Sequence, residues 1–280
     1  MKMLNLGCGK RFHTDWVNVD FVSSGKGVIA HNLLQGIPFG ENEFDVVYHS
    51  HVLEHFSKDD AKKFIAECYR VLKKGGILRI AVPDLERIAR AYLEQMESAL
   101  NGNMDAQNNY EWMMIEMYDQ TVRNESGGEM AKYLSQVNIP NEKFVYSRIG
   151  EEGKVIRERS LEQGINKHTY NYAVVPYWKK IFNPAWYINV IQRIFSHQQF
   201  KKKEADKKAL DIGKFRVGGE IHQWMYDRYS LAKLLENSGL GNIKVKSATD
   251  SNIANWNSYV LESKNGIVFK PDSLFMEAVK

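Results

Sequence analysis

The sequence predicts an α/β fold with a doubly wound, Rossmann-like and mostly parallel sheet, carrying a largely helical insertion. In the first third of the chain, short apolar runs that end in Gly, Pro or an acid alternate with a helical pattern, and such alternation favours a parallel sheet. Residues 96–218 are rich in Asn, Gln, Tyr, Trp and Lys and show no strand alternation. We therefore assign residues 1–95 and 219–280 to the core and residues 96–218 to the insertion, within a length of 280 residues that allows both.

Five buried strands are expected before the insertion, because runs rich in Val and Ile that end at Gly or Pro are typical of them. They are Met3–Leu6, Val17–Asp20, Gly27–His31, Phe44–Ser50 and Gly76–Val82. Apolar residues at helical spacing predict a helix over Lys58–Leu72, which Gly75 and Gly76 end. After the insertion we expect a helix over Tyr229–Asn237 and strands over Asn242–Ala248 and Ser273–Val279.

Composition narrows the class of protein. The net charge of +4 and the absence of a dense basic stripe disfavour a nucleic-acid partner. Two cysteines, Cys8 and Cys68, fit a reducing compartment. The sequence shows neither a secretory leader nor a membrane-spanning run, so we expect a cytoplasmic protein.

The segment 184–203 places apolar residues on one helical face beside lysines. That pattern is typical of core packing, with peripheral membrane contact as the alternative.

The polar residues that end the predicted strands indicate a ligand site, since open parallel sheets bind ligands beyond the carboxyl ends of their strands. These ends are Gly7-Cys8-Gly9, Asp20, His31-Asn32, His49-Ser50-His51 and Pro83-Asp84. The glycines allow a ligand to approach the backbone closely. A carboxylate after the second strand, Asp20, can accept from ribose hydroxyls, and the amide of Asn32 can meet an adenine edge.

Four segments, LNLGCGK, WVNVD, LLQGIPFGENEFDVVYHSHVLEH and ECYRVLKKGGILRIAVPDLERIARAY, together resemble the class I S-adenosylmethionine-dependent methyltransferases, in the branch that modifies small molecules and glycans. The resemblance runs from Met3 to Tyr92. Many members of that branch belong to polysaccharide biosynthesis. It implies S-adenosylmethionine as cofactor and a set of cofactor-binding residues. These are Gly7, Cys8 and Gly9 facing the cofactor, Asp20 on the ribose, Asn32 and Leu33 beside the adenine, and His49 and Ser50 near the methionine portion.

Two features depart from the family pattern. The family usually has Asp at the position of Asn32, whose carbonyl oxygen can still accept from the adenine amino group. Only ten residues separate Gly9 from Asp20, and a parallel crossover normally needs about a dozen or more. The first helix is therefore expected to shrink to a turn or two.

The expected reaction is O-methylation of a saccharide or saccharide-linked intermediate, and a hydroxyl acceptor needs a general base. Candidates are His51, Asp84 and His222, with a helix cap as the alternative for Asp84. The sequence after the fourth strand lacks the Asp/Asn-Pro-Pro-aromatic tetrad of nucleic-acid amino-methylation. A cofactor-binding regulatory module without transferase activity is the alternative function. The insertion is expected to be a helical lid that selects the acceptor and contributes little to cofactor binding.

The segment HSHVLEH (His49–His55) is similar to the H-x-H-x-D-H pattern of metallo-β-lactamase-like hydrolases, whose histidines and Asp bind metal. Leu53 stands where that pattern has Asp, and the acid is Glu54, one residue later. A metal-dependent hydrolase is therefore the least favoured function. We expect no metal site, with Glu54 and His55 capping or packing the turn and His51 pointing into the crevice if His49 does.

Overall fold

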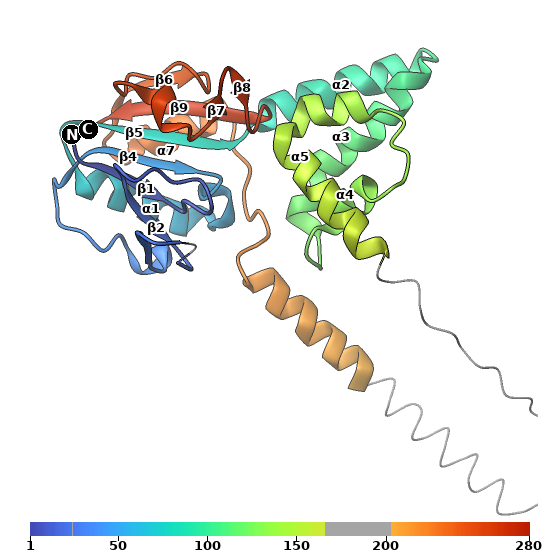
Figure 1. Cartoon of the computed structure of the whole chain (residues 1–280), viewed down its shortest axis with the longest axis horizontal. Helices are drawn as coiled ribbons and strands as arrows, with labels where there is room; N and C mark the ends of the chain where they lie inside the picture. Colours follow the sequence, from blue (N-terminus) through green and yellow to red (C-terminus); the bar gives the residue numbers. More distant parts are fainter. Residues whose placement is uncertain (24, 166–202) are drawn as a thin grey trace, which may run out of the picture.

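The computed structural model describes residues 1–23, 25–165 and 203–280. Its main sheet has seven strands in the order β3-β2-β1-β4-β5-β9-β6. The strands are β1 (Met3–Leu6), β2 (Val17–Asp20), β3 (Val28–Ala30), β4 (Phe44–Ser50), β5 (Leu72–Pro83), β6 (Gly241–Lys246) and β9 (Ser273–Val279). The first five pair in parallel, and β9 lies antiparallel between β5 and β6. The Rossmann-like, mostly parallel architecture is thus confirmed (Figure 1).

Helices α1 (Lys58–Val71) and α7 (Arg228–Asn237) pack their apolar residues on the sheet. Ser57 caps α1 by accepting from the Asp60 N–H, and Asp227 begins α7 with a capping box. The short elements are η1 (Leu33–Gln35), η2 (Leu53–His55), η3 (Trp256–Tyr259), β7 (Ser263–Lys264) and β8 (Ile267–Val268). As the short crossover requires, the described residues between Gly9 and β2 form turns and no helix.

Helices α2 (Leu85–Leu100), α3 (Met104–Val122), α4 (Gly128–Leu134) and α5 (Glu142–Ile165) form a helical unit beside the sheet (Figure 1). The unit has its own apolar core, which includes Trp112, Met113 and Val145. Ile88 of α2 is buried in that core. The predicted boundary at residue 96 therefore falls inside α2, and the helical unit begins at Leu85, because α2 packs on α3.

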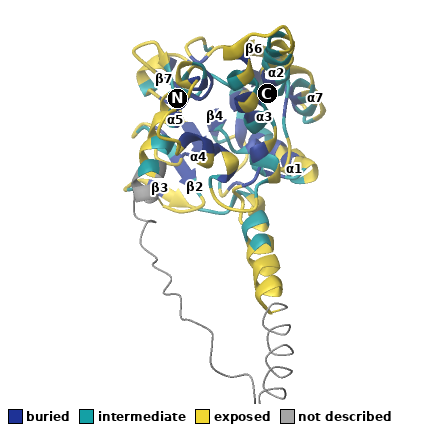
Figure 2. Ribbon diagram, turned by 90° about the vertical axis from the view of Figure 1, so that its right-hand side faces the viewer, coloured by how far each residue is buried: buried dark blue, intermediate teal, exposed yellow. Residues whose placement is uncertain are grey.

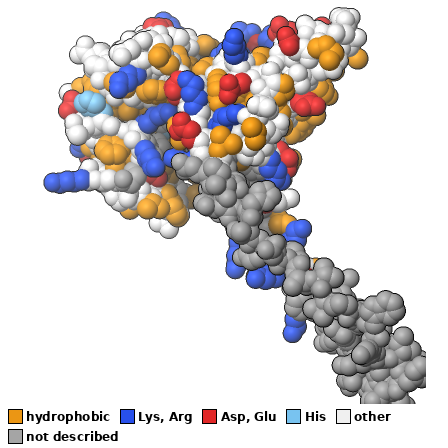
Figure 3. Space-filling model, turned by 45° about the vertical axis from the view of Figure 1, so that its right-hand side comes forward, with side chains coloured by type: hydrophobic (Ala, Val, Ile, Leu, Met, Phe, Trp, Pro, Cys, Tyr) orange, Lys and Arg blue, Asp and Glu red, His pale blue; other side chains and the backbone are white. Residues whose placement is uncertain are grey.

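Residues 203–217 form a further helix that projects from the body of the molecule and is largely exposed (Figure 2). The proposed membrane-contact segment, 184–203, falls almost entirely on residues outside the described part of the chain. Within the described part, no helix combines the length and apolarity needed to cross a membrane. On the face drawn in Figure 3, basic and acidic side chains are interspersed over the core and the helical unit.

A buried ion network ties the carboxyl-terminal segments to the sheet. The guanidinium of Arg79 on β5 is fully buried and donates to Glu277 Oε1 on β9 at 2.7 Å. It also donates to the carboxylate of Glu262 and, at 2.7 Å, to the carbonyl of Ser247. Trp256 covers the guanidinium at 4.4 Å. One cation thus holds β9, η3 and the loop after β6 together.

We expect Arg79→Met to lower the free energy of unfolding by about 3–5 kcal/mol, because it leaves buried carboxylates without their counter-charge. Arg90→Met is the matched control, since Arg90 pairs with Glu86 at 2.9 Å on the surface and exposed pairs contribute only about 0–1 kcal/mol. Urea unfolding curves of both variants measure the difference. Equal losses in the two would contradict this role for Arg79.

Candidate functional site

A cavity of about 510 Å³ opens at the carboxyl edge of the sheet. The turn after β1 and the end of β4 form one side of it, and α5 and the segment before β9 form the other. Its lining residues are Asn5, Gly7, Cys8, Gly9, Lys10, Arg11, Tyr48, Ser50, His51, Glu151, Glu152, Val155, Ile156, Arg159, Leu261, Phe269 and Lys270. This volume is within the roughly 300–1,000 Å³ typical of small-molecule sites.

The glycine turn Gly7–Gly9 is shaped by its contacts with β2 and with the loop after β4. The Gly7 N–H donates to the Val19 carbonyl at 2.8 Å. A Cβ on Gly7 would lie 2.3 Å from Val52 Cγ2, whereas a Cβ on Gly9 would meet nothing within 4 Å. Both residues have positive φ, at 65° and 54°. Gly7 therefore allows the turn to pack. Because Gly9 has no side chain, space remains beside the turn at the cavity, which a ligand can fill.

Cys8 lies in the same turn, and its thiol is buried. Burial and the nearby Asp20 carboxylate raise the pKa of the thiol to about 11. The thiol is therefore protonated at neutral pH, a form that is a poor nucleophile. Cys8 contributes to the wall of the cavity and is not a reactive group.

Asp20 lies at the end of β2 beside the glycine turn, as the sequence predicts. Its carboxylate accepts from the N–H of Gly9 and, at 2.6 Å, from the N–H of Phe21. A carboxylate offers about four acceptor positions, so two bonds leave capacity for the hydroxyls of a ribose. Asp20 is not among the described residues that line the 510 Å³ cavity, so its contact with a ribose stays a prediction.

The two residues predicted to contact adenine, Asn32 and Leu33, lie outside the lining of the 510 Å³ cavity. The Asn32 side-chain oxygen accepts from the Leu34 N–H at 3.0 Å and caps η1. Its amide N–H group is then the part best suited to meet a base. Leu33 lines a separate small pocket together with Phe56 and Phe64. Neither Asn32 nor Leu33 is among the described residues that line the 510 Å³ cavity, so their contact with adenine stays a prediction.

The structure corrects the prediction for His49. Successive side chains of a strand point to opposite faces, and Tyr48 and Ser50 face the cavity. His49 therefore points the other way, where it is fully buried with its ring 5.1 Å from that of Phe64 on α1. Burial lowers the pKa of His49 to about 4. It is a neutral core residue that reaches neither a cofactor in the cavity nor a metal shared with His51, which removes the first ligand of the hydrolase pattern.

Of the three residues predicted as bases, His51 alone is among the described residues that line the cavity. It has a positive φ of 54° and lines both the 510 Å³ cavity and a narrow cleft of about 90 Å³ under the helical unit. Its Nδ1 lies 3.1 Å from Glu54 Oε1, and its Nε2 lies 2.8 Å from Ser273 Oγ. A carboxylate at Nδ1 favours the tautomer with the proton there, which leaves the lone pair on Nε2.

Asp84 and His222 occupy other positions. Asp84 is buried at the start of α2 and accepts from the Arg87 N–H at 3.1 Å, so it serves as the helix cap. His222 is 6% exposed, and burial lowers the pKa of its imidazole to about 3. Neither is among the described residues that line the 510 Å³ cavity. Local capping and burial place these side chains away from the cavity, and their roles as bases stay predictions that the geometry does not favour.

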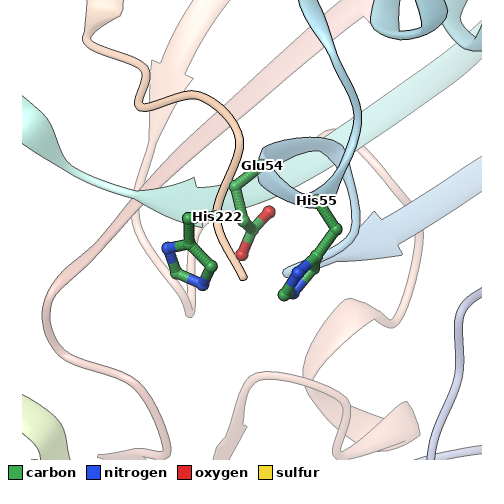
Figure 4. Close-up of side chains that lie close together, drawn as sticks. All are labelled: Glu54, His55 and His222. Carbon is green, nitrogen blue, oxygen red and sulfur yellow. The ribbon is translucent and has the colours of Figure 1, made fainter. Parts of the chain in front are cut away.

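His222 instead joins a cluster with Glu54 and His55 (Figure 4). The carboxylate of Glu54 lies beside the two imidazole rings, which contact each other edge to face with their centroids 4.9 Å apart. Glu54 and His55 belong to η2, whereas His222 comes from the loop before α7. Sequence reasoning placed Glu54 and His55 in a turn and treated His222 separately. It missed the cluster because only the tertiary fold brings the two segments together.

Helix α5 also contributes to the cavity, through Glu151, Glu152, Val155, Ile156 and Arg159. The helix kinks at Gly150, where a Cβ would lie 2.5 Å from the Phe269 carbonyl oxygen. Next to the kink, Glu152 pairs with Lys270 at 3.0 Å. The helical unit is thus part of the cavity wall, and how little it contributes to cofactor binding stays a prediction.

Polar residues of α3 divide between two roles that the sequence left open. Asp119 and Arg123 form a buried ion pair at 2.8 Å, which is an internal contact. Gln120 lines the narrow cleft next to His51. Asp119 and Arg123 also line a separate pocket of about 930 Å³ beside the helix over residues 203–217, so the contact of these residues with an acceptor stays a prediction.

Comparison with known proteins identifies one domain. Residues 18–80 match the family model described as a methyltransferase domain. The match runs from β2 into β5 and includes Asp20, His51 and Glu54. No curated protein matches the chain significantly.

Solved structures that match include an S-adenosylmethionine-dependent methyltransferase of Thermotoga maritima, described as a possible histamine N-methyltransferase, with 22% identity and a TM-score of 0.27 over 35% of this chain. The match covers 52% of that structure, about half its length. Another, from Archaeoglobus fulgidus, has 14% identity and a TM-score of 0.37 and covers 100% of this chain and 86% of the other. A third belongs to a complex with the Trm112 methyltransferase activator of Haloferax volcanii, with 9% identity, a TM-score of 0.36, and 99% and 81% covered.

The family match over residues 18–80 and the mostly parallel sheet support an S-adenosylmethionine-dependent methyltransferase domain in this part of the chain.

We expect Gly9→Ala to weaken binding of S-adenosylmethionine at least tenfold, because its methyl group would occupy the open space at the turn. Gly102→Ala is the control, since Gly102 also has positive φ, at 85°, and open space around it. Both variants should lose about 1–2 kcal/mol of stability from the left-handed backbone. Calorimetric titration that shows equal affinity for the two variants would place the ligand elsewhere.

Asp20→Ala should weaken both S-adenosylmethionine and its demethylated product, because a charged acceptor that faces hydroxyl donors is lost. The expected cost is about 1.5–3 kcal/mol, which is roughly a 10- to 150-fold rise in Kd. Asp15→Ala, which removes an exposed carboxylate from the same crossover, should leave Kd unchanged. Unaltered calorimetric affinity in Asp20→Ala would remove Asp20 from the site.

Proposed function

We propose that the chain, through its class I methyltransferase domain, transfers a methyl group from S-adenosylmethionine to a hydroxyl of a saccharide or saccharide-linked intermediate. The observation that carries the proposal is one cavity that joins the glycine turn at Gly9 to the imidazole of His51. A nucleoside site and a base are thereby held in the same space, as transfer to a hydroxyl requires.

When bound, S-adenosylmethionine supplies a methyl group on a positively charged sulfur, and the C–S bond breaks as the acceptor oxygen forms its bond to that carbon. His51 accepts the hydroxyl proton at Nε2, the atom that now meets Ser273 Oγ at 2.8 Å. The Glu54 carboxylate, 3.1 Å from Nδ1, stabilises the imidazolium that forms. The products are a methyl ether, a neutral thioether and a protonated His51.

Support for a sugar acceptor comes from the outer part of the cavity and from the resemblance to glycan-modifying enzymes. Glu151, Arg159 and Lys270 offer charged hydrogen-bonding groups, and Phe269 offers an apolar ring that Arg11 covers at 4.2 Å. Sugar hydroxyls exchange hydrogen bonds with such groups, and the C–H faces of sugar rings contact aromatic side chains. The cavity therefore combines both kinds of contact that a saccharide needs.

The direct test is incubation of the full chain with methyl-labelled S-adenosylmethionine and panels of free and lipid-linked saccharides, followed by mass spectrometry. Label on an oxygen of a saccharide is the expected result. Cofactor binding without label on any acceptor class would favour the regulatory module instead. Label on nitrogen or carbon would contradict O-methylation.

With an accepted saccharide in hand, His51→Gln should lower the rate of transfer by on the order of 10²–10⁴, the contribution typical of a general base. Binding of the demethylated cofactor should not change, because His51 is assigned to the acceptor. His31→Ala is the matched control, since His31 is also half-buried and contacts a backbone carbonyl, that of Gly36, at 2.9 Å. A His51→Gln enzyme with full activity would show that transfer needs no base at this position.

A further inference from the structure

We infer that Glu54, His55 and His222 form a binding site for one divalent transition-metal ion, beside the proposed base His51. One ligand atom from each of the three residues lies within 4.8 Å of the others. Ligand atoms about 2.0–2.2 Å from one tetrahedral ion lie about 3.3–3.6 Å apart, so small side-chain rotations bring these three atoms onto a single ion. Figure 4 shows the three side chains close together.

Two buried polar atoms of the cluster lack partners among the described residues. Glu54 is fully buried, and although its Oε1 lies 3.1 Å from His51 Nδ1, its Oε2 has no hydrogen-bond partner in that part of the chain. His222 is also buried, and its Nδ1 has none either. Leaving such groups without partners costs free energy. A bound cation would satisfy both atoms together.

Hydrogen bonds hold the ligands in position before any ion binds. His55 Nδ1 lies 3.2 Å from the Ile221 carbonyl, so Nδ1–H donates there and the lone pair remains on Nε2. Metal-binding histidines commonly donate the other ring N–H in this way. The N–H groups of Gln223 and His222 donate to the carbonyls of Glu54 and Gln120, at 2.7 and 2.9 Å. The loop that carries His222 is thus fixed to both η2 and α3.

The donor set selects the kind of ion. Two imidazoles and one carboxylate suit Zn²⁺ or Fe²⁺, whereas Mg²⁺ and Ca²⁺ prefer oxygen ligands alone. Three protein ligands also leave a coordination position open. A water molecule can take that position.

A metal site at Glu54, His55 and His222 differs from the sequence-based expectation of no metal site. The ligands differ from those of the hydrolase pattern, because His49 faces the core and His222 replaces it from a distant part of the chain. Neither the histidine pair His49 and His51 nor an Asp at position 53 is needed.

The test uses the full chain, stripped with a chelator, dialysed against Zn²⁺ and then analysed for metal content. We expect one Zn²⁺ per chain, no retained Mg²⁺ in a parallel dialysis, and a rise in Tm with Zn²⁺. His55→Ala and His222→Ala should each lose the ion and the rise in Tm. His31→Ala should keep both, although it also removes a half-buried imidazole that contacts a backbone carbonyl.

Circular dichroism shows whether each variant is folded, and the visible spectrum of bound Co²⁺ reports the ligands directly. If the His222→Ala variant does not fold, the His55→Ala variant decides the question, because the His55 side chain is half-exposed and its loss is easier to tolerate. That variant should lose the Co²⁺ spectrum. A wild-type chain that retains no Zn²⁺, or a folded His55→Ala variant that retains it fully, would overturn the inference. These measurements need neither S-adenosylmethionine nor an acceptor, so their failure is distinct from failure of the proposed transfer.

Discussion

The parallel pairing of β1 with both β2 and β4 brings the carboxyl ends of these strands to one edge of the sheet, and the site depends on this constraint. The glycine turn, Asp20 and His51 follow three different strands, and the shared edge alone makes them neighbours. Strand alternation then decides which side chains take part. It sends Ser50 to the cavity and His49 to the core against Phe64, so adjacent residues of one motif have unrelated roles.

The helical unit completes the cavity that the sheet begins. Its docking depends on the kink of α5 at Gly150, where the backbone approaches the Phe269 carbonyl too closely for a larger residue. The ion pair between Glu152 and Lys270, at 3.0 Å, fixes the same contact. Helix α5 therefore belongs to both the large cavity and the narrow cleft, because Glu152 and Ile156 line both of them.

Glu54 is shared by the proposed base and the proposed metal site. One carboxylate oxygen lies 3.1 Å from His51 Nδ1, and the carboxylate also belongs to the cluster with His55 and His222. Fully buried and ionised, it is stable only where positive charge offsets it. An imidazolium at His51 during transfer and a bound cation at the other side would each supply that charge. The same acid can thus orient a base and hold a metal ion.

The sequence alone determined the strands, the core helices and the glycine turn, because these depend on local periodicity and on residues such as Gly and Pro whose effects are local. The strand Phe44–Ser50 and the strand Ser273–Val279 have the predicted bounds. Tertiary structure decided the rest. Whether Asp84 acts as a base or caps α2, whether His49 faces a ligand or the core, and whether His222 meets Glu54 all depend on segments far apart in the chain. Burial and partners are properties of packed elements, and no pattern within a single segment contains them.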